Sequence, residues 1–334
     1  MSSLHAPRRV NAIFGFCIKL PLLELPDVIL IKILRKLDVV SIVKLSFLSE
    51  KMKRVIRSVN YPLKSLVLYA AEPKSELVRF YGPSMMDINL GTRIQLVDRL
   101  PKDKRLVEVI GGIGLAWGNF FQLDLPFIRP PGADRKSLED LIFRYFLELF
   151  RKIDILGVTL DSGKLKELDM WNVTKSIDFL HYNCRRLKRI PVEEMKFILE
   201  EIDVKKQLKI VPKVEEGFRH STGFKMNRVD ILNDASWVDL DAVINSNSYY
   251  ITFESYREIT KRQINNLLKL WISGERMKNL TSFYINKCAI IGEEDVFEGI
   301  PMQLDTPGTV KRSDGKMARI QVKNNSFKIW VPKK

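Results

Sequence analysis

The sequence predicts an α+β or α/β protein that begins with a small helical unit. Apolar residues recur at helical spacing from Leu22 to Ser58. Short β-type runs with Gly and Pro between them follow from Leu63 to Pro131. From Ser137 onward, strand-like and helix-like segments alternate, which favours a parallel sheet with helices on one or both faces. We therefore expect a tail, a helical unit, a β-rich connecting region and a C-terminal strand–helix domain, at 1–19, 20–62, 63–135 and 136–334.

The composition is that of a folded protein with charged partners. Of the 334 residues, 46% are hydrophobic, and the chain has 18 Phe, 9 Tyr and 5 Trp, enough apolar surface for a sizeable core. Lys and Arg outnumber Asp and Glu by 55 to 40, which gives a net charge of +15. Such a balance points to nucleic acid, an anionic membrane or an acidic protein as partner.

The cysteines indicate a reducing compartment. Cys17, Cys184 and Cys288 are widely spaced and odd in number, so they do not read as a disulfide framework. Reduced thiols are typical of the cytoplasm and/or nucleus. A lysine and a proline interrupt the apolar stretch Ala12–Leu23 and no cleavage site follows it, so we expect no signal peptide. No run approaches the roughly 20 apolar residues of a membrane span, and we expect no membrane partner.

The N-terminal unit reads as three short helices. Pro26 suits the first position of a helix, and Asp27 places negative charge in its first turn. Asp38 can cap a second helix, and Met52 lies among the apolar positions of a third. Three helices in roughly 40 residues make a small core, so this unit needs a partner or a neighbouring domain to be stable.

The C-terminal region alternates strands and helices with an uneven period. Strands near residues 230, 251 and 284 recur at intervals of about 21–33 residues, which overlaps the spacing of leucine-rich repeats, although no strict repeat frame persists. We expect Thr260 to cap a helix that carries Trp271 on its apolar face and ends at Gly274. The runs 318–324 and 326–331 predict a closing hairpin. The expected architecture is an irregular, leucine-rich-repeat-like strand–helix sheet.

The sequence offers no constellation of catalytic or metal-binding residues. His181 and Cys184 could share one face of a helix, but a zinc site needs four ligands and no second pair is present. The glycines of Gly111–Gly118 follow a strand, yet no helix follows to face a phosphate, so a tight turn between strands is favoured. The basic runs Lys51–Arg54 and Cys184–Arg189 are expected on solvated helix faces. We therefore predict no enzyme, no cofactor and no metal.

The block Leu25–Ile56 resembles an F-box. Leu25-Pro26-Asp27 opens the first helix, and apolar residues follow at the positions where an F-box carries them. A basic patch follows the second helix, as in the family, whereas Met52 stands where many F-boxes carry Trp.

The C-terminal region strengthens this resemblance. Segments 224–241, 259–285 and 314–331 are similar to the F-box-associated region of a large family expanded in nematodes. That region commonly ends in a Leu-x-x-Trp helix, a Gly and a Leu-rich strand. Together the two resemblances cover about Leu20 to Trp330.

The resemblance implies a substrate-receptor subunit of an SCF-type E3 ubiquitin ligase. Its F-box would bind a Skp-family adaptor, which links to cullin and RING subunits, and its C-terminal region would hold an unknown protein substrate, which the excess of positive charge suggests is acidic or phosphorylated. The expected adaptor-binding residues are Leu25, Pro26, Ile29, Ile33, Leu45 and Leu48. Aromatic candidates for substrate binding are Tyr249, Tyr250, Phe253, Tyr284 and Trp330, each of which could instead pack in the core.

Two other functions remain open from the residues alone. A basic nucleic-acid-binding protein would explain the charge, but no zinc ligands, basic arm or aromatic RNA platform is visible, so this alternative is disfavoured. An enzyme built on the Gly-rich turn is disfavoured further, because the phosphate-binding helix is missing.

Overall fold

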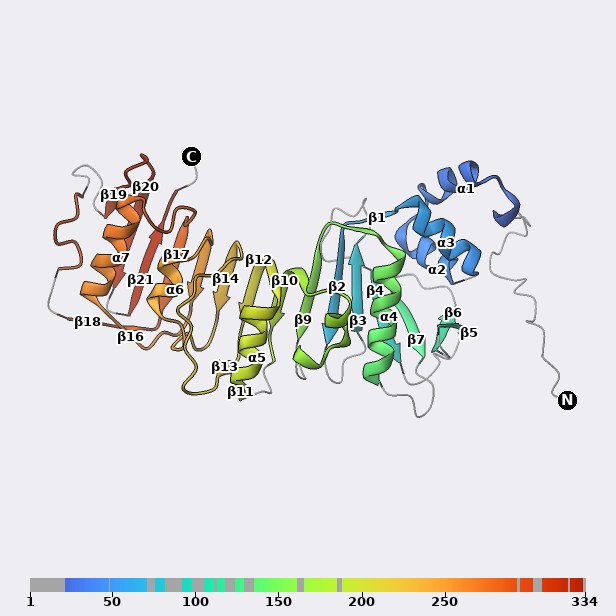
Figure 1. The fold of residues 1–334 in the computed structure, drawn as a ribbon, viewed down its shortest axis with the longest axis horizontal. Helices are drawn as coiled ribbons and strands as arrows, with labels where there is room; N and C mark the ends of the chain where they lie inside the picture. The colour runs from blue at the N-terminus through green and yellow to red at the C-terminus, as the bar shows by residue number, and fades with distance from the viewer. Residues whose placement is uncertain are drawn as a thin grey trace.

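The computed structural model describes most of the chain from the first predicted helix onward. Its described residues are 22–47, 49–70, 76–81, 92–97, 105–110, 113–117, 124–128, 135–160, 165–184, 188–292, 295–302, 308–323 and 325–332. Three short helices pack at one end of a long twisted sheet, and the C-terminal hairpin lies at the opposite end (Figure 1). The predicted α+β class, with an N-terminal helical unit followed by a mixed sheet, is confirmed.

The three-helix unit forms where the sequence predicted it. A short 3-10 turn, η1 (Leu22–Glu24), precedes α1 (Asp27–Leu34), α2 (Val39–Ser46) and α3 (Glu50–Val59). Asp38 caps α2 by accepting the Ser41 backbone N–H at 2.9 Å. Ser49 caps α3 in the same way, accepting the Met52 N–H at 3.1 Å. Each cap satisfies a backbone donor that the first helical turn leaves free.

Seven strands of the sheet are parallel and follow one another in chain order. They are β2 (Ser65–Ala70), β9 (Leu156–Leu160), β10 (Ser176–Tyr182), β12 (Asp203–Ile210), β14 (Arg228–Ile231), β15 (Tyr250–Phe253) and β17 (Ser282–Asn286). Gln207 pairs with Arg228, 21 residues further on, and Tyr250 pairs with Ser282, 32 residues further on. Each strand therefore returns beside its predecessor, as in a solenoid. The leucine-rich-repeat character of these turns stays a prediction.

Further strands extend the sheet at both ends, and all of their pairs are antiparallel except β4 with β7, which is parallel. At the C-terminal end β17 pairs with β21 (Ser326–Trp330), followed by β20 (Met317–Lys323) and β19 (Thr309–Lys311). Beyond β2 the order is β3 (Glu76–Tyr81), β4 (Thr92–Val97), β7 (Asp124–Ile128), β6 (Ile113–Trp117) and β5 (Arg105–Ile110). Because β2 pairs with β9, the sheet runs without a break across the predicted boundary between residues 135 and 136.

The Gly-rich segment belongs to a hairpin. Strands β5 and β6 are antiparallel, and Ile110 pairs with Ile113. This agrees with the tight turn expected from the sequence, while Gly111 and Gly112 themselves lie outside the described residues.

The connections between strands form a second layer. They contain the helices α4 (Arg135–Leu149), α5 (Val192–Lys196), α6 (Leu240–Ile244) and α7 (Lys261–Ser273), the π-helical turn η5 (Phe197–Glu201), and the 3-10 turns η3 (Leu165–Glu167) and η4 (Asp169–Asn172). Short parallel pairs join neighbouring connections: β1 (Pro62–Leu63) with β8 (Lys152–Ile153), β11 (Arg189–Ile190) with β13 (Lys213–Val214), and β16 (Glu258–Thr260) with β18 (Ala289–Ile291). Figure 1 shows the helices lying along one side of the sheet.

Helix α7 begins and ends as predicted. Thr260 and Gln263 form a capping box, in which Thr260 Oγ1 accepts the Gln263 N–H at 3.1 Å and Gln263 Oε1 accepts the Thr260 N–H at 2.8 Å. Gly274 ends the helix at φ 75°, a left-handed conformation that glycine adopts without a Cβ penalty. Trp271, in the last turn, is fully buried.

A single apolar core lies between the sheet and the helices. Alternate residues of each parallel strand point into it, because successive strand side chains point to opposite faces. Phe253, Phe283 and Phe327 lie on adjacent strands and pack edge to face, with ring centroids 5.6 and 5.9 Å apart, and all three are inaccessible to solvent. The remaining residues of each parallel strand point away from the helices, on the opposite face of the sheet.

One segment differs from the sequence-based prediction. His181 and Cys184 do not share a helix: His181 lies in strand β10, and Cys184 follows that strand with its side chain buried. The helix expected to carry His181 and Cys184 was therefore wrong. Parallel pairing with β9 and β12 provides the hydrogen bonds that fix β10 as a strand, and this long-range pairing leaves no local sequence signal.

Helix α4 joins the three-helix unit to the sheet. Tyr145 on α4 donates its hydroxyl hydrogen to Ser46 Oγ at 2.8 Å, and both side chains are buried. Lys53 Nζ lies 4.5 Å from the centre of the Tyr145 ring and 3.6 Å from Glu148 Oε2. Burial raises the pKa of Tyr145, so its hydroxyl remains a hydrogen-bond donor at neutral pH.

Among the helices that the structure describes, none combines the length and the apolar character of a transmembrane span.

Candidate functional site

Helix α1 presents an apolar surface to solvent. Its eight residues bury Leu30 and Leu34 against the unit's core, which turns Val28 and Ile29 outward. Val28 is 66% exposed and Ile29 is 46% exposed, and Pro26, just before the helix, is exposed too. Adjacent exposed aliphatic side chains on one helix are typical of a surface that another protein covers.

The predicted adaptor-binding residues differ in their exposure to solvent. Pro26 and Ile29 lie on this exposed surface, while Leu25 and Ile33 are half-buried beside it. Leu45 is 6% exposed and packs in the core of the three-helix unit, so it cannot be a major contact without rearrangement. Leu48 lies outside the described residues. Val28 is an exposed neighbour that the sequence argument did not include.

The outward side of the sheet carries two rows of side chains. Strand register places the first row across the sheet in the order Phe179, Gln207, Arg228, Tyr250, Ser282, Trp330, Arg319. The second row runs His181, Lys209, Asp230, Thr252, Tyr284, Lys328, Gln321. We call this surface the open face of the sheet.

In one half of the open face, on β10, β12 and β14, several charged side chains pair with one another. Asp230 is buried, and its Oδ2 accepts hydrogen bonds from Arg228 Nε at 2.6 Å and Gln207 Nε2 at 3.0 Å. Lys206 Nζ lies 3.1 Å from Asp178 Oδ1. These groups satisfy one another, so they leave little charge to attract a ligand.

His181 in the same half is not poised for acid–base chemistry. Its ring lies 4.9 Å from that of Phe179, and Phe179 itself covers Gly157, where a Cβ atom would collide with the phenyl ring. Burial is the main cause that lowers the pKa of His181. Phe179 and His181 therefore form a neutral, partly covered surface.

The other half of the open face, on β15, β17, β20 and β21, is aromatic and basic. Tyr250 is 40% exposed, and Tyr284 and Trp330 are partly exposed. Lys328 Nζ lies 4.8 Å from the Trp330 ring centre and 5.9 Å from that of Tyr284. Arg319, on the strand beside Trp330, is exposed. We call these five residues the aromatic–basic patch.

Three predicted substrate-binding residues meet in this patch and two do not. Tyr250, Tyr284 and Trp330 lie on adjacent strands of the open face. Phe253 is fully buried on the core side of β15, so it cannot contact a substrate. Tyr249 is 41% exposed but precedes β15, where its carbonyl accepts backbone hydrogen bonds from the start of the next strand.

The two cations of the patch, Lys328 and Arg319, were not predicted from the sequence. Lys328 lies two residues before Trp330, so strand alternation would have placed it on the same face. Arg319 is next to Trp330 only through the register of β20 and β21, which the hairpin sequence alone does not state.

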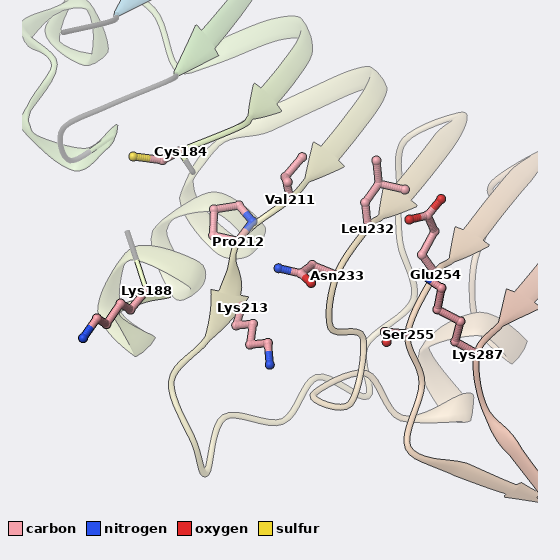
Figure 2. A pocket seen from close by; sticks show the side chains of 10 residues that line it. All are labelled: Cys184, Lys188, Val211, Pro212, Lys213, Leu232, Asn233, Glu254, Ser255 and Lys287. Carbon is pink, nitrogen blue, oxygen red and sulfur yellow. The ribbon is translucent and has the colours of Figure 1, made fainter. Parts of the chain in front are cut away.

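A pocket of about 430 Å³ lies at the carboxyl ends of the parallel strands (Figure 2). Its wall includes Lys213, Asn233, Glu254 and Lys287. Figure 2 shows these side chains spread along the strand ends rather than converging on one point. Cys184, the one thiol among the lining residues, is buried.

Metal binding finds no support within the described part of the chain. No group of three or more His, Cys, Asp or Glu side chains is close enough there to hold an ion.

Comparison with known proteins identifies two domains. Residues 22–64 match the F-box domain family, and residues 218–285 match a family described as F-box associated. The first match covers the three helices with the exposed surface of α1, and the second ends in β17 and includes Tyr250 and Tyr284. No curated protein and no solved structure matches the chain.

These matches agree in order and position with the resemblance drawn from the sequence. F-box domains bind Skp-type adaptors in SCF complexes, and proteins with these domains are typically non-catalytic adaptors. The chain therefore contains an F-box domain near its N-terminus and an F-box-associated domain in its C-terminal half.

Proposed function

We propose that this protein is a substrate-receptor subunit of an SCF-type E3 ubiquitin ligase. Its F-box binds a Skp-family adaptor, which connects it to cullin and RING subunits, and the sheet domain holds a protein substrate. The protein carries out no bond chemistry itself. Its contribution is proximity, because tethering raises the effective concentration of a substrate lysine near the charged conjugating enzyme.

The observation that carries this proposal is the exposed apolar surface of α1 within the matched F-box. Val28 and Ile29 remain in water although the neighbouring Leu30 and Leu34 are fully buried. A protein partner that covers these side chains would gain roughly 25 cal/mol for each Å² of apolar surface removed from water. The buried, reduced thiols of Cys184 and Cys288 support a location in the cytoplasm and/or nucleus.

The test is capture of a recombinant Skp-family adaptor by the full-length protein. Replacing Pro26 and Ile29 together with alanine removes two exposed contacts and leaves the buried side of α1 intact. Truncating anchors in a packed interface costs roughly 2–4 kcal/mol, so we expect adaptor affinity to fall by tens to hundreds of fold. Val28→Ala should weaken binding as well.

Lys32→Ala provides the matched control, since Lys32 is an exposed polar residue on the same helix. It should bind the adaptor as the wild type does. Circular dichroism and thermal melts verify that every variant is folded. Undiminished capture by the folded Pro26→Ala/Ile29→Ala variant contradicts the proposal.

A further inference from the structure

The four strands of the aromatic–basic patch contain no carboxylate. Strands β15, β17, β20 and β21 read YITF, SFYIN, MARIQVK and SFKIW. No ion pair is formed by Lys328 or Arg319 with any residue that the structure describes. Their charges are therefore available to a partner, unlike those of Arg228 and Lys206 in the other half of the open face.

The patch also holds its rings in place. Tyr284 pairs with Lys328 across two antiparallel strands, and the Lys328 ammonium group lies close to the rings of both Tyr284 and Trp330. The cation occupies the negative faces of the two rings, which orients them without burying them. Rings held this way lose little conformational entropy when they contact an apolar side chain.

We propose that the aromatic–basic patch binds an acidic peptide segment that carries apolar side chains. Lys328 and Arg319 pair with carboxylates of the segment, while Tyr250, Tyr284 and Trp330 contact the apolar side chains between them. Four adjacent strands span about 14 Å, which matches four to five residues of extended peptide. Only the statement that this segment belongs to a ligase substrate rests on the proposed function.

A single-stranded nucleic acid is the competing occupant, because aromatic rings and cations also bind bases and phosphates. The protein partner is favoured because the patch includes strands β15 and β17 of the matched F-box-associated domain, and the same chain carries an F-box.

The first measurement is fluorescence anisotropy of full-length protein with labelled peptides. The probe alternates Glu and Leu and is long enough to span the patch. One control peptide replaces Leu with Ser, and another replaces Glu with Lys. An oligothymidylate of equal charge is the nucleic-acid probe. We expect the Glu–Leu peptide to bind most tightly and its affinity to fall as salt is raised.

Two double variants distinguish the effect of the patch residues from that of the net charge of the protein. Lys328→Gln with Arg319→Gln should weaken binding of the Glu–Leu peptide by about tenfold or more, because two charge-assisted contacts are lost. Arg262→Gln with Lys269→Gln removes the same charge from the exposed side of α7, in the helical layer, and should change affinity by less than about twofold. Tyr284→Ser should weaken the Glu–Leu peptide more than the Glu–Ser peptide.

Three results would overturn the proposal: equal losses in the two double variants, tighter binding of oligothymidylate than of the Glu–Leu peptide, or no preference for Leu over Ser. Adaptor capture is measured on the same preparations. Peptide binding without adaptor capture would leave this inference standing and remove the proposed function. Adaptor capture without peptide binding would leave the proposed function standing and overturn this inference.

Discussion

Arg312 is a charged side chain that the fold buries almost completely. It is 3% exposed, and it donates to Asp314 from both Nε and a terminal nitrogen and to the Lys278 carbonyl at 3.0 Å. Its guanidinium carbon lies 5.2 Å from the centre of the Trp271 ring. These contacts tie the loop before β20 to the end of α7. Arg312 also holds the pKa of Asp314 well below its usual range.

The low pKa of Asp314 predicts an acid-dependent loss of stability. Because the folded-state pKa is depressed, the ion pair contributes in full above the ordinary carboxyl pKa of about 4 and is lost as pH falls through the folded-state value. Asp314→Asn should therefore lower the melting temperature at neutral pH, and the gap from wild type should narrow in acid. Glu275→Gln, at an exposed carboxylate, is the control. A gap that stays constant with pH contradicts this assignment.

At the scale of the element, strand β15 shows how neighbouring residues take different roles. Ile251 and Phe253 point into the core, whereas Tyr250 and Thr252 lie on the open face. Tyr250 and Phe253 were both predicted as candidate substrate contacts, because both are aromatic residues in one strand. The register with β14 and β17, which sets the inward side, comes from contacts between distant parts of the chain.

This alternation predicts opposite effects of two substitutions three residues apart. Phe253→Ala removes a fully buried ring and should lower the free energy of unfolding by about 3–5 kcal/mol. Tyr250→Ala should cost much less than Phe253→Ala, because the Tyr250 side chain lies at the surface and is 40% exposed, and yet should weaken peptide binding. Urea unfolding together with anisotropy checks both. A larger stability loss for Tyr250→Ala would mean that the register is wrong.

Local signals predicted the helices better than the strand order. Pro26, Asp38, Thr260 and Gly274 act through contacts within a few residues, so the sequence alone located the ends of their helices. Strand β10 was missed because its pairing partners lie more than 20 residues away on either side. The patch was predicted in part for the same reason: its aromatic residues are visible in the sequence, but Arg319 reaches it only through pairing.

At the scale of the whole molecule, α4 fixes the F-box to the sheet. Tyr145 stacks on Phe47 with ring centroids 5.0 Å apart, and Tyr61 lies 6.3 Å from Phe150. Together with the Tyr145–Ser46 hydrogen bond, these contacts join both units into a common hydrophobic core. The F-box is therefore packed directly against the sheet domain through α4.

Loss of this junction should loosen the F-box. Tyr145→Phe removes a buried hydrogen bond and should lower stability by about 1–2 kcal/mol, and Tyr145→Ala should add the loss of the aromatic packing. Hydrogen exchange, read by mass spectrometry, should then speed up in α2 and α3 while β15 and β17 stay protected. Arg144→Ala, at an exposed position on α4, is the control. Unchanged exchange in α2 and α3 would show that α4 does not hold the F-box.

The two-sidedness of the sheet has a consequence for how such proteins diversify. Residues that face the helices form the core and stabilise the fold, whereas those on the open face contribute less to stability. Mutations at positions such as 250, 284, 319, 328 and 330 can accumulate at little cost in folding. Under the proposed function, selection could change which partner the sheet binds through substitutions on this one surface, while the core and α1 stay the same.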